Sequence, residues 1–103
     1  MPHVIITERA QAGINRCFAF LYAIAPKPAL RARRTILETI KRLRRFPYHG
    51  RPYIPPFPNE AEEGEGLREL IIKGGYLALY RYIEEENTVY IMAVKHGREA
   101  RYY

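Results

Sequence analysis

Three short runs near the end of the chain combine apolar residues with a two-residue alternation. They span residues 67–72, 76–83 and 88–95 and are rich in branched and aromatic side chains, a composition typical of β-strands. Gly74 and Gly75 separate the first two runs, and a glycine pair tolerates the positive φ of a tight hairpin turn. Residues 84–87 form a second polar turn. The pattern therefore predicts a three-stranded antiparallel meander.

Alternation assigns the side chains of the last two runs to the two faces of the sheet. In the middle strand, one face carries Leu77, Leu79 and Ile83, and the other carries Tyr76, Ala78, Tyr80 and Tyr82. In the last strand, one face carries Val89, Ile91 and Ala93, and the other carries Tyr90, Met92 and Val94. One face is expected to pack on helices. The tyrosine-bearing face either meets a partner or completes a second core layer.

The apolar period changes to three or four residues in the first half of the chain. A short strand is predicted at residues 3–6, and Thr7 is placed to cap the helix that follows. The buried face of that helix is predicted to be Ile14, Cys17, Phe18, Leu21, Ile24 and Ala25. A second helix is predicted from Pro28 to about residue 46, because proline suits a first helical position. Its buried stripe is Ala29, Ala32, Ile36, Ile40 and Leu43.

The order of these elements predicts an α+β fold, β-α-α-β-β-β, as one domain over residues 1–103. A helical hairpin is expected to pack on one face of a mainly antiparallel four-stranded sheet. Residues 47–66, rich in proline and glutamate, are predicted to form an irregular loop, since proline lacks a donor and constrains its predecessor. The aromatic residues of this loop suggest that part of it packs on the domain.

The charge of the chain points to an acidic partner. Seventeen Lys and Arg residues against eleven acidic ones give a net charge of +6, and arginine favours bidentate contact with phosphate or carboxylate. Nucleic acid and an acidic protein segment both fit. A basic face is predicted on the second helix, opposite its buried stripe: Arg31, Arg34, Lys41, Arg42 and Arg45. Glu38 lies within one helical turn of three of these cations, so partial internal pairing is expected.

Several classes of protein are disfavoured. Cys17 is the single cysteine, which rules out a disulfide framework and a thiolate metal cluster and suggests a small buried residue. The N-terminus has no signal-peptide layout, and no apolar run approaches the length of a membrane span. We therefore expect a cytoplasmic protein with no cofactor, no metal and no membrane partner.

The element order, with the segments Leu67-Arg68-Glu69-Leu70, Tyr80-Arg81 and 93–98 (AVKHGR), resembles the RelE/ParE superfamily of toxins from type II toxin–antitoxin, or plasmid stabilisation, systems. The resemblance covers nearly the whole chain and is most specific in its last forty residues. It implies a small α+β toxin that a cognate antitoxin neutralises. It leaves open a homodimer or a toxin–antitoxin hetero-oligomer.

The resemblance also implies two possible mechanisms. RelE-like toxins cut messenger RNA on the ribosome, whereas ParE-like toxins act on DNA gyrase. Metal-free RNA cleavage needs a base, an acid and cations for the phosphorane charge. The resemblance matches Arg68, and Arg98 with Tyr102 or Tyr103, to such a site. His96 is a candidate acid or base, and Arg81 is a nearby cation that lies out of register with the pattern. Two further expected positions are apolar, at Leu70 and Leu77, and this departure favours the ParE-like branch, which is not an enzyme.

The surface expected to bind the target or the antitoxin is Arg68, Arg81, His96, Arg98, Arg101, Tyr102 and Tyr103. Two alternatives to a gyrase-binding toxin stay open. One is a metal-independent, ribosome-dependent endoribonuclease built on the groups named above. The other is a non-toxic nucleic-acid-binding domain that uses the basic face for phosphates, with binding that weakens steeply as salt rises.

Overall fold

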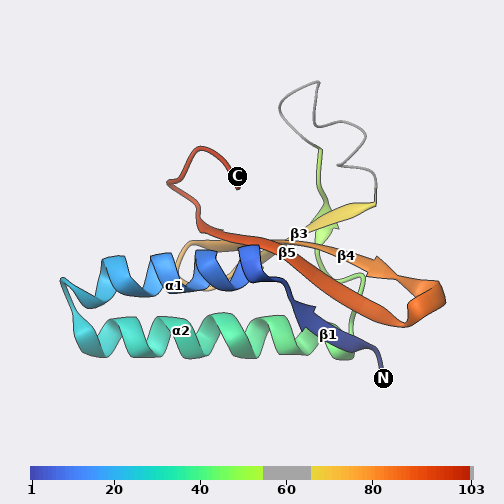
Figure 1. Ribbon diagram of the computed structural model, residues 1–103, viewed down its shortest axis with the longest axis horizontal. Coiled ribbons are helices and arrows are strands. Elements are labelled where there is room, and N and C mark those ends of the chain that lie inside the picture. Colours follow the sequence, from blue (N-terminus) through green and yellow to red (C-terminus); the bar gives the residue numbers. More distant parts are fainter. Residues whose placement is uncertain (55–65, 103) are drawn as a thin grey trace.

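The computed structural model describes residues 1–54 and 66–102. Two helices lie side by side against one face of a sheet, and the C-terminal tail lies over the opposite face (Figure 1). The helices are α1 (Glu8–Tyr22) and α2 (Pro26–Lys41), and α2 continues into the 3₁₀ turn η1 (Arg42–Arg44). The strands are β1 (His3–Ile6), β2 (Arg51–Pro52), β3 (Leu67–Ile72), β4 (Tyr76–Ile83) and β5 (Thr88–His96), with the 3₁₀ turn η3 (Glu84–Glu86) before β5. The predicted α+β fold is confirmed.

The sheet has five strands in the order β1-β5-β4-β3-β2, one more than predicted. Strands β3, β4 and β5 form the predicted antiparallel meander, and β1 pairs in parallel with β5. The additional strand β2 pairs with β3 and places Arg51 opposite Glu69. The prediction of an irregular loop over residues 47–66 is therefore wrong at β2. A strand can form there because an edge strand tolerates proline. The part of that prediction on residues 55–65 lies outside the described residues.

Both helices form where the apolar period indicates, with shifted ends. The Thr7 Oγ1 accepts a hydrogen bond from the Ala10 amide at 3.2 Å and donates to the Ile91 carbonyl at 2.7 Å, so the cap also ties α1 to β5. Helix α1 ends at Tyr22, before the predicted end. Ile24 consequently lies in the turn between the helices and is 71% exposed, which corrects its predicted burial.

The main core lies between the helices and the tyrosine-bearing face of β4. Tyr76, Ala78 and Tyr80 are buried there together with residues of α1, α2, β3 and β5, so the helices cover this face. The predicted buried stripe of α2 is confirmed, with Ala32 partly buried. Burial raises the pKa of the Tyr80 phenol, and this hydroxyl accepts a hydrogen bond from the Gly50 amide at 2.7 Å.

A β-bulge in β5 changes which side chains face the helices. Tyr80 lies opposite Ile91, but Leu79 lies opposite Ala93, so Met92 has no partner residue on β4. Ile91 therefore faces the helices, and Ala93 faces the tail. The predicted faces of this strand are therefore wrong at Ala93 and Val94, because strict alternation contains no bulge. Ala93 does not share a face with Val89 and Ile91, and Val94 does not share one with Met92.

A smaller core lies on the face of the sheet that the tail covers. Its buried members are Leu67, Leu79, Ala93 and Tyr102, with Tyr53, Leu77 and Met92 partly buried against them. The expectation that part of the segment after residue 47 packs on the domain is confirmed at Tyr53. The sheet therefore has a packed layer on both sides.

Helix α1 approaches β5 so closely that only glycine fits at position 13. A Cβ at Gly13 would lie 2.2 Å from the Val94 carbonyl oxygen. Replacing Gly13 with alanine should therefore lower the free energy of unfolding by about 1–3 kcal/mol, because α1 must move away from the sheet. Urea denaturation followed by circular dichroism measures this change. Ala12→Ser on the exposed side of α1 should cost about 0.5 kcal/mol; a neutral or stabilising Gly13→Ala would contradict the close approach.

Candidate functional site

The C-terminal tail, residues 97–102, is fixed to the sheet by a buried hydrogen bond. The Tyr102 hydroxyl donates to Oε2 of Glu69 at 2.5 Å, and Tyr102 and Glu69 are only 8% and 7% exposed. Arg51 donates to Oε1 of the same carboxylate from Nε at 3.0 Å and from Nη2 at 2.5 Å. The ring of Tyr53 packs edge-on against Tyr102 at 5.6 Å, and the Lys95 ammonium lies 4.8 Å above the Tyr102 ring. We call Glu69, Arg51, Tyr53, Lys95 and Tyr102 the tail anchor.

The anchor keeps Tyr102 protonated. Burial, and then the hydrogen bond to the Glu69 carboxylate, raise the pKa of the Tyr102 phenol well above its ordinary value. A phenol held in this way donates to Glu69 and does not act as a base. Tyr102, predicted as a surface contact or a catalytic group, is therefore placed inside the protein as a structural donor.

The raised pKa of Tyr102 predicts how stability changes in alkaline solution. Above about pH 10 the unfolded chain loses its tyrosine protons, while folded Tyr102 keeps its own. The folded state then binds more protons than the unfolded state, so the free energy of unfolding falls as pH rises. Urea denaturation at several values from about pH 8 to 11 should show a steeper fall for the native sequence than for Tyr102→Phe. Parallel curves would contradict the raised pKa.

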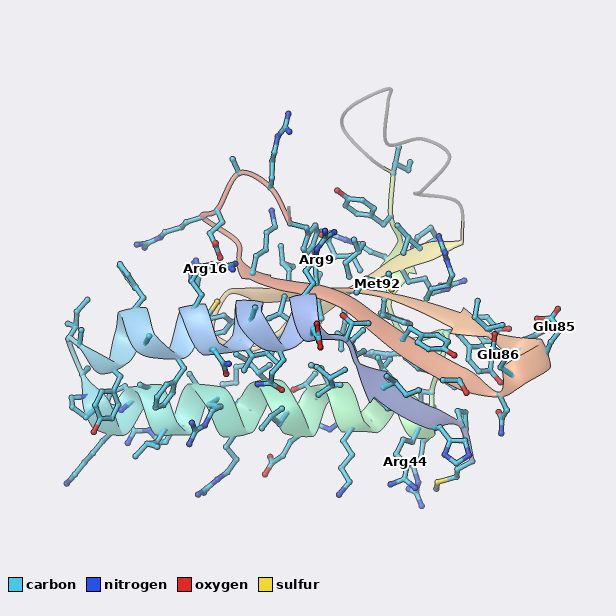
Figure 2. All side chains as sticks on the ribbon, viewed as in Figure 1. Arg9, Arg16, Arg44, Glu85, Glu86 and Met92 are labelled. Carbon is cyan, nitrogen blue, oxygen red and sulfur yellow. The ribbon has the colours of Figure 1, made fainter. Side chains whose placement is uncertain are left out.

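A second group of side chains joins the start of the tail to α1. The Glu99 carboxylate accepts hydrogen bonds from the His96 amide at 2.7 Å and from Nε of Arg16 at 3.0 Å. The amide of Arg98 donates to Nδ1 of His96 at 3.1 Å. In Figure 2 the labelled Arg16 lies on the side of α1 that faces the tail. Glu99 thus holds His96 at the end of β5, and His96 in turn holds the backbone of Arg98.

Cys17 lies beside this group and is buried, as predicted. Burial raises the pKa of the Cys17 thiol, and the negative charge of Glu99 raises it further. A thiol with a raised pKa is a poor nucleophile because the reactive form is the thiolate. Cys17 is therefore a packing residue, with its sulfur 3.9 Å from Oε2 of Glu99.

A pocket of about 560 Å³ opens between α1 and the end of the sheet. Phe20 and Ile24 on its wall are 74% and 71% exposed. Exposed apolar side chains gathered beside charged ones are typical of surfaces that bind a protein. We call this site the hairpin pocket, and its lining residues are Arg16, Cys17, Phe20, Leu21, Ile24, Tyr76, His96, Arg98 and Glu99.

Arg68 lies on the opposite side of the sheet from the tail anchor. It is paired in register with Tyr80, and its Nη1 donates to the carbonyl oxygens of Gly50 at 2.7 Å and Tyr48 at 3.3 Å. Its guanidinium also lies 5.1 Å above the Tyr48 ring. Arg68 therefore holds the segment before β2 in place.

The two apolar positions that the resemblance marks differ in environment. Leu70 shares the helix-facing side of β3 with Arg68 and is 2% exposed in the main core, where a charge would be expelled. Leu77 lies on the tail-bearing face and is partly buried. The residues of β3 on that face are Leu67, Glu69 and Ile71. The tail-bearing face of β3 thus carries no cation.

The groups assigned to RNA cleavage do not form one site in the described residues. His96 and Arg98 lie together at the hairpin pocket, whereas Tyr102 is buried in the tail anchor. Arg68 lies on the helix-facing side, and Arg81 pairs with Leu67 on the tail-bearing face. Arg101 is exposed, and Tyr103 lies outside the described residues. Of the groups assigned to RNA cleavage, the described structure therefore brings His96 and Arg98 into one pocket.

The sequence interpretation missed the residues that position the tail. Glu69 gave a usable signal, because a carboxylate inside an apolar strand requires a partner. Arg16 and Glu99, in contrast, lie 83 positions apart, and neither has a local signature. Long-range pairs of this kind become visible only in the fold.

The basic face lies on the outer side of α2 and η1, as predicted, and each of its five cations is exposed. Glu38 was expected to pair with Arg34, Lys41 or Arg42. That expectation is wrong, because the ion pairs found among the described residues are Arg16–Glu99 and Arg51–Glu69. Glu38 therefore forms no direct ion pair with the basic face, and it lowers the net charge of that face by one.

Residues 1–54 and 66–102 contain no candidate metal site and no candidate membrane-spanning helix. No group of three or more His, Cys or acidic side chains in these ranges is arranged to hold a metal ion. None of their helices combines the length and the apolar character that crossing a membrane requires.

Comparison with known proteins relates nearly the whole chain to toxins. The family described as ParE toxin of type II toxin–antitoxin system, parDE, matches residues 4–101. The fold is similar to that of the chromosomal ParDE toxin–antitoxin system from P. aeruginosa, with a TM-score of 0.73, 20% identity and coverage of 93% of this chain and 96% of that chain. It is also similar to the toxin–antitoxin complex RelBE2 from Mycobacterium tuberculosis, with a TM-score of 0.63, 24% identity and coverage of 93% and 99%. No curated protein sequence matches the chain.

Proposed function

Because the chain belongs to the ParE toxin family of type II toxin–antitoxin systems, we propose that it stops growth by binding DNA gyrase and does not cleave RNA. The observation that carries this proposal is the separation of the required groups over two faces of the sheet. The Tyr102 hydroxyl is hydrogen-bonded to Glu69. The Arg68 guanidinium is hydrogen-bonded to backbone carbonyls. An acid, a base and cations would have to converge on one phosphate for RNA cleavage.

The hairpin pocket is the surface that we assign to gyrase. Phe20 and Ile24 offer an apolar wall for an anchoring side chain, and such anchors supply most of the affinity of a protein interface. Arg98 is exposed at the rim, where its guanidinium is suited to a carboxylate. Its backbone is held by His96, which Glu99 holds in turn. The pocket therefore fits a protein segment with an apolar residue next to an acidic one.

A cognate antitoxin neutralises the toxin under this proposal, in a toxin–antitoxin hetero-oligomer in the cytoplasm, where gyrase acts. The solved structures with a similar fold are named as toxin–antitoxin systems, which supports such a partner. The net charge of +6 favours an acidic antitoxin segment, because opposite charges speed association.

The proposal is tested with purified gyrase and with cells in parallel. The full chain should inhibit supercoiling of relaxed plasmid by gyrase at micromolar or lower concentration. Induction in cells should arrest growth while messenger RNA ends mapped during translation stay unchanged. Co-expression of the protein encoded by the neighbouring gene should restore growth.

New RNA ends at ribosomal positions, with normal supercoiling, would instead establish the endoribonuclease. Normal supercoiling together with intact messenger RNA and normal growth would reject both mechanisms.

A further inference from the structure

The cations of the basic face of α2 take no part in the interactions that hold the described structure together. Arg16, Arg51 and Arg68 are each engaged by a carboxylate or a carbonyl. The five cations of the basic face, in contrast, make no hydrogen bond, ion pair or ring contact with another described residue. Figure 2 shows long side chains extending from α2 away from α1 and the sheet. These cations are therefore available to an external anion.

The basic face is a straight row on a rigid support. Ala29, Ile36 and Ile40 bury the opposite side of α2, so the helix cannot rotate to hide its cations. From Arg31 to Lys41 the row covers ten α-helical steps, about 15 Å at 1.5 Å per residue, and Arg42 and Arg45 continue it at the 3₁₀ turn η1. One strand of duplex DNA rises about 3.4 Å per phosphate. The α2 part of the row therefore spans the axial rise of about four base pairs.

Apart from Glu38, the described acidic side chains lie outside α2. Glu38 is the single acid of α2, and the largest group of described acids is Glu84–Glu86 in η3. Figure 2 shows Glu85 and Glu86 at the tip of the β4–β5 turn. The surface is therefore polarised, and a cationic surface of this kind attracts a polyanion over several ångströms.

The side chains next to the row indicate whether it suits single-stranded nucleic acid or a duplex. Leu30 and Leu37 are exposed on α2 at 46% and 39%, and neither can stack on a base. Proteins that bind single strands combine cations with several aromatic platforms. Helix α2 contains no aromatic residue, and the exposed Phe46 lies only at the end of the row, after Arg45. Arginine pairs bidentately with phosphate, which requires no contact with bases. These observations favour a backbone contact on a duplex.

We propose that the basic face of α2 binds the phosphate backbone of double-stranded DNA without sequence preference. This binding uses different residues from the hairpin pocket, and it does not depend on gyrase being the target. As a consequence of this binding, the protein accumulates on accessible DNA.

The test measures binding of the purified full chain to a fluorescent 20-base-pair duplex by anisotropy, from about 50 to 300 mM salt. The slope of log K against log salt is about −0.9 for each neutralised phosphate. The double variant Arg31→Gln/Arg34→Gln should make the slope shallower by nearly two and weaken binding at least tenfold at low salt. The matched control is Lys73→Gln/Arg98→Gln, which removes the same charge outside α2 and should leave the slope unchanged.

Three outcomes would overturn the proposal. If both double variants reduce the slope equally, net charge and not the basic face determines binding. If a single-stranded oligonucleotide of the same charge binds more tightly than the duplex, the face recognises single strands. If polyglutamate of the same charge competes as well as duplex DNA, its partner is an acidic protein. Circular dichroism of each variant confirms folding, since all four substituted side chains are exposed.

Discussion

Replacing Tyr102 with alanine is expected to lower the free energy of unfolding by about 3 kcal/mol, in the range found when a buried aromatic ring is removed from a core. The ring fills the smaller core against Leu79 and Ala93, and its loss leaves a cavity beneath the tail. The hydroxyl also supplies a donor to the buried Glu69 carboxylate. A loss of this size is a large part of the stability of a domain of this length.

Urea denaturation at neutral pH measures the effect, and two variants separate its causes. Tyr102→Phe keeps the ring and removes the hydrogen bond to Glu69, so it should cost about 1–2 kcal/mol. Tyr22→Phe, at a half-exposed position on α1, should change stability by less than about 0.5 kcal/mol. If Tyr102→Ala costs no more than Tyr22→Phe, the tail is not anchored as the structure shows.

Replacing either Phe20 or Ile24 with alanine is expected to weaken inhibition of gyrase about 30-fold. Truncating an anchoring apolar residue of an interface costs about 2 kcal/mol, and 1.4 kcal/mol corresponds to a tenfold change in affinity. Both side chains are more than two-thirds exposed in the free protein, so their truncation should leave stability nearly unchanged. The measurement is the toxin concentration that halves supercoiling.

Leu30→Ala provides the matched control for these two variants. Leu30 is an exposed apolar residue of α2 outside the hairpin pocket, and its truncation should leave inhibition unchanged. If Phe20→Ala and Ile24→Ala inhibit gyrase fully, at unchanged melting temperature, the hairpin pocket is not part of the gyrase interface. If only antitoxin binding weakens, the pocket belongs to the antitoxin instead.

Local periodicity was sufficient to predict the order and type of the main elements. The buried stripe of α2 follows directly from its spacing of three and four residues, and the glycine pair at 74–75 marks the first hairpin turn. Both glycines have positive φ, 102° and 89°, the conformation that the sequence indicates there. These features depend on neighbours in the chain, and so a single sequence reveals them.

Features that depend on distant parts of the chain could not be predicted in the same way. The bulge at Met92 has no local signature, yet it turns Ala93 to the tail-bearing face. The two-residue strand β2 exists because β3 offers it an edge. The choice between a partner and a core for the tyrosine-bearing face of β4 was decided by where the helices dock.

In the candidate site too, the sequence indicated some features and others became visible only in the fold. The composition of the segment 96–98 indicated an important region, and His96 and Arg98 do lie together. Their fixation by Glu99 and Arg16 required the fold, since α1 reaches them from 80 positions away. Similarly, position 68 matches the superfamily in residue type, but the structure turns Arg68 to the helix-facing side.

The parallel pairing of β1 with β5 joins the first element of the chain to the last. His3 lies opposite Thr88 and Ile6 lies opposite Ile91, so the sheet gains this edge only when its final strand is available. Contacts between such distant segments slow folding. Synthesis proceeds at roughly 5–20 residues per second. The helical hairpin therefore exists for seconds before β5, the strand on which it packs, has been made. The folded surface that a partner would recognise therefore exists only after β5 has been synthesised and has paired with β1.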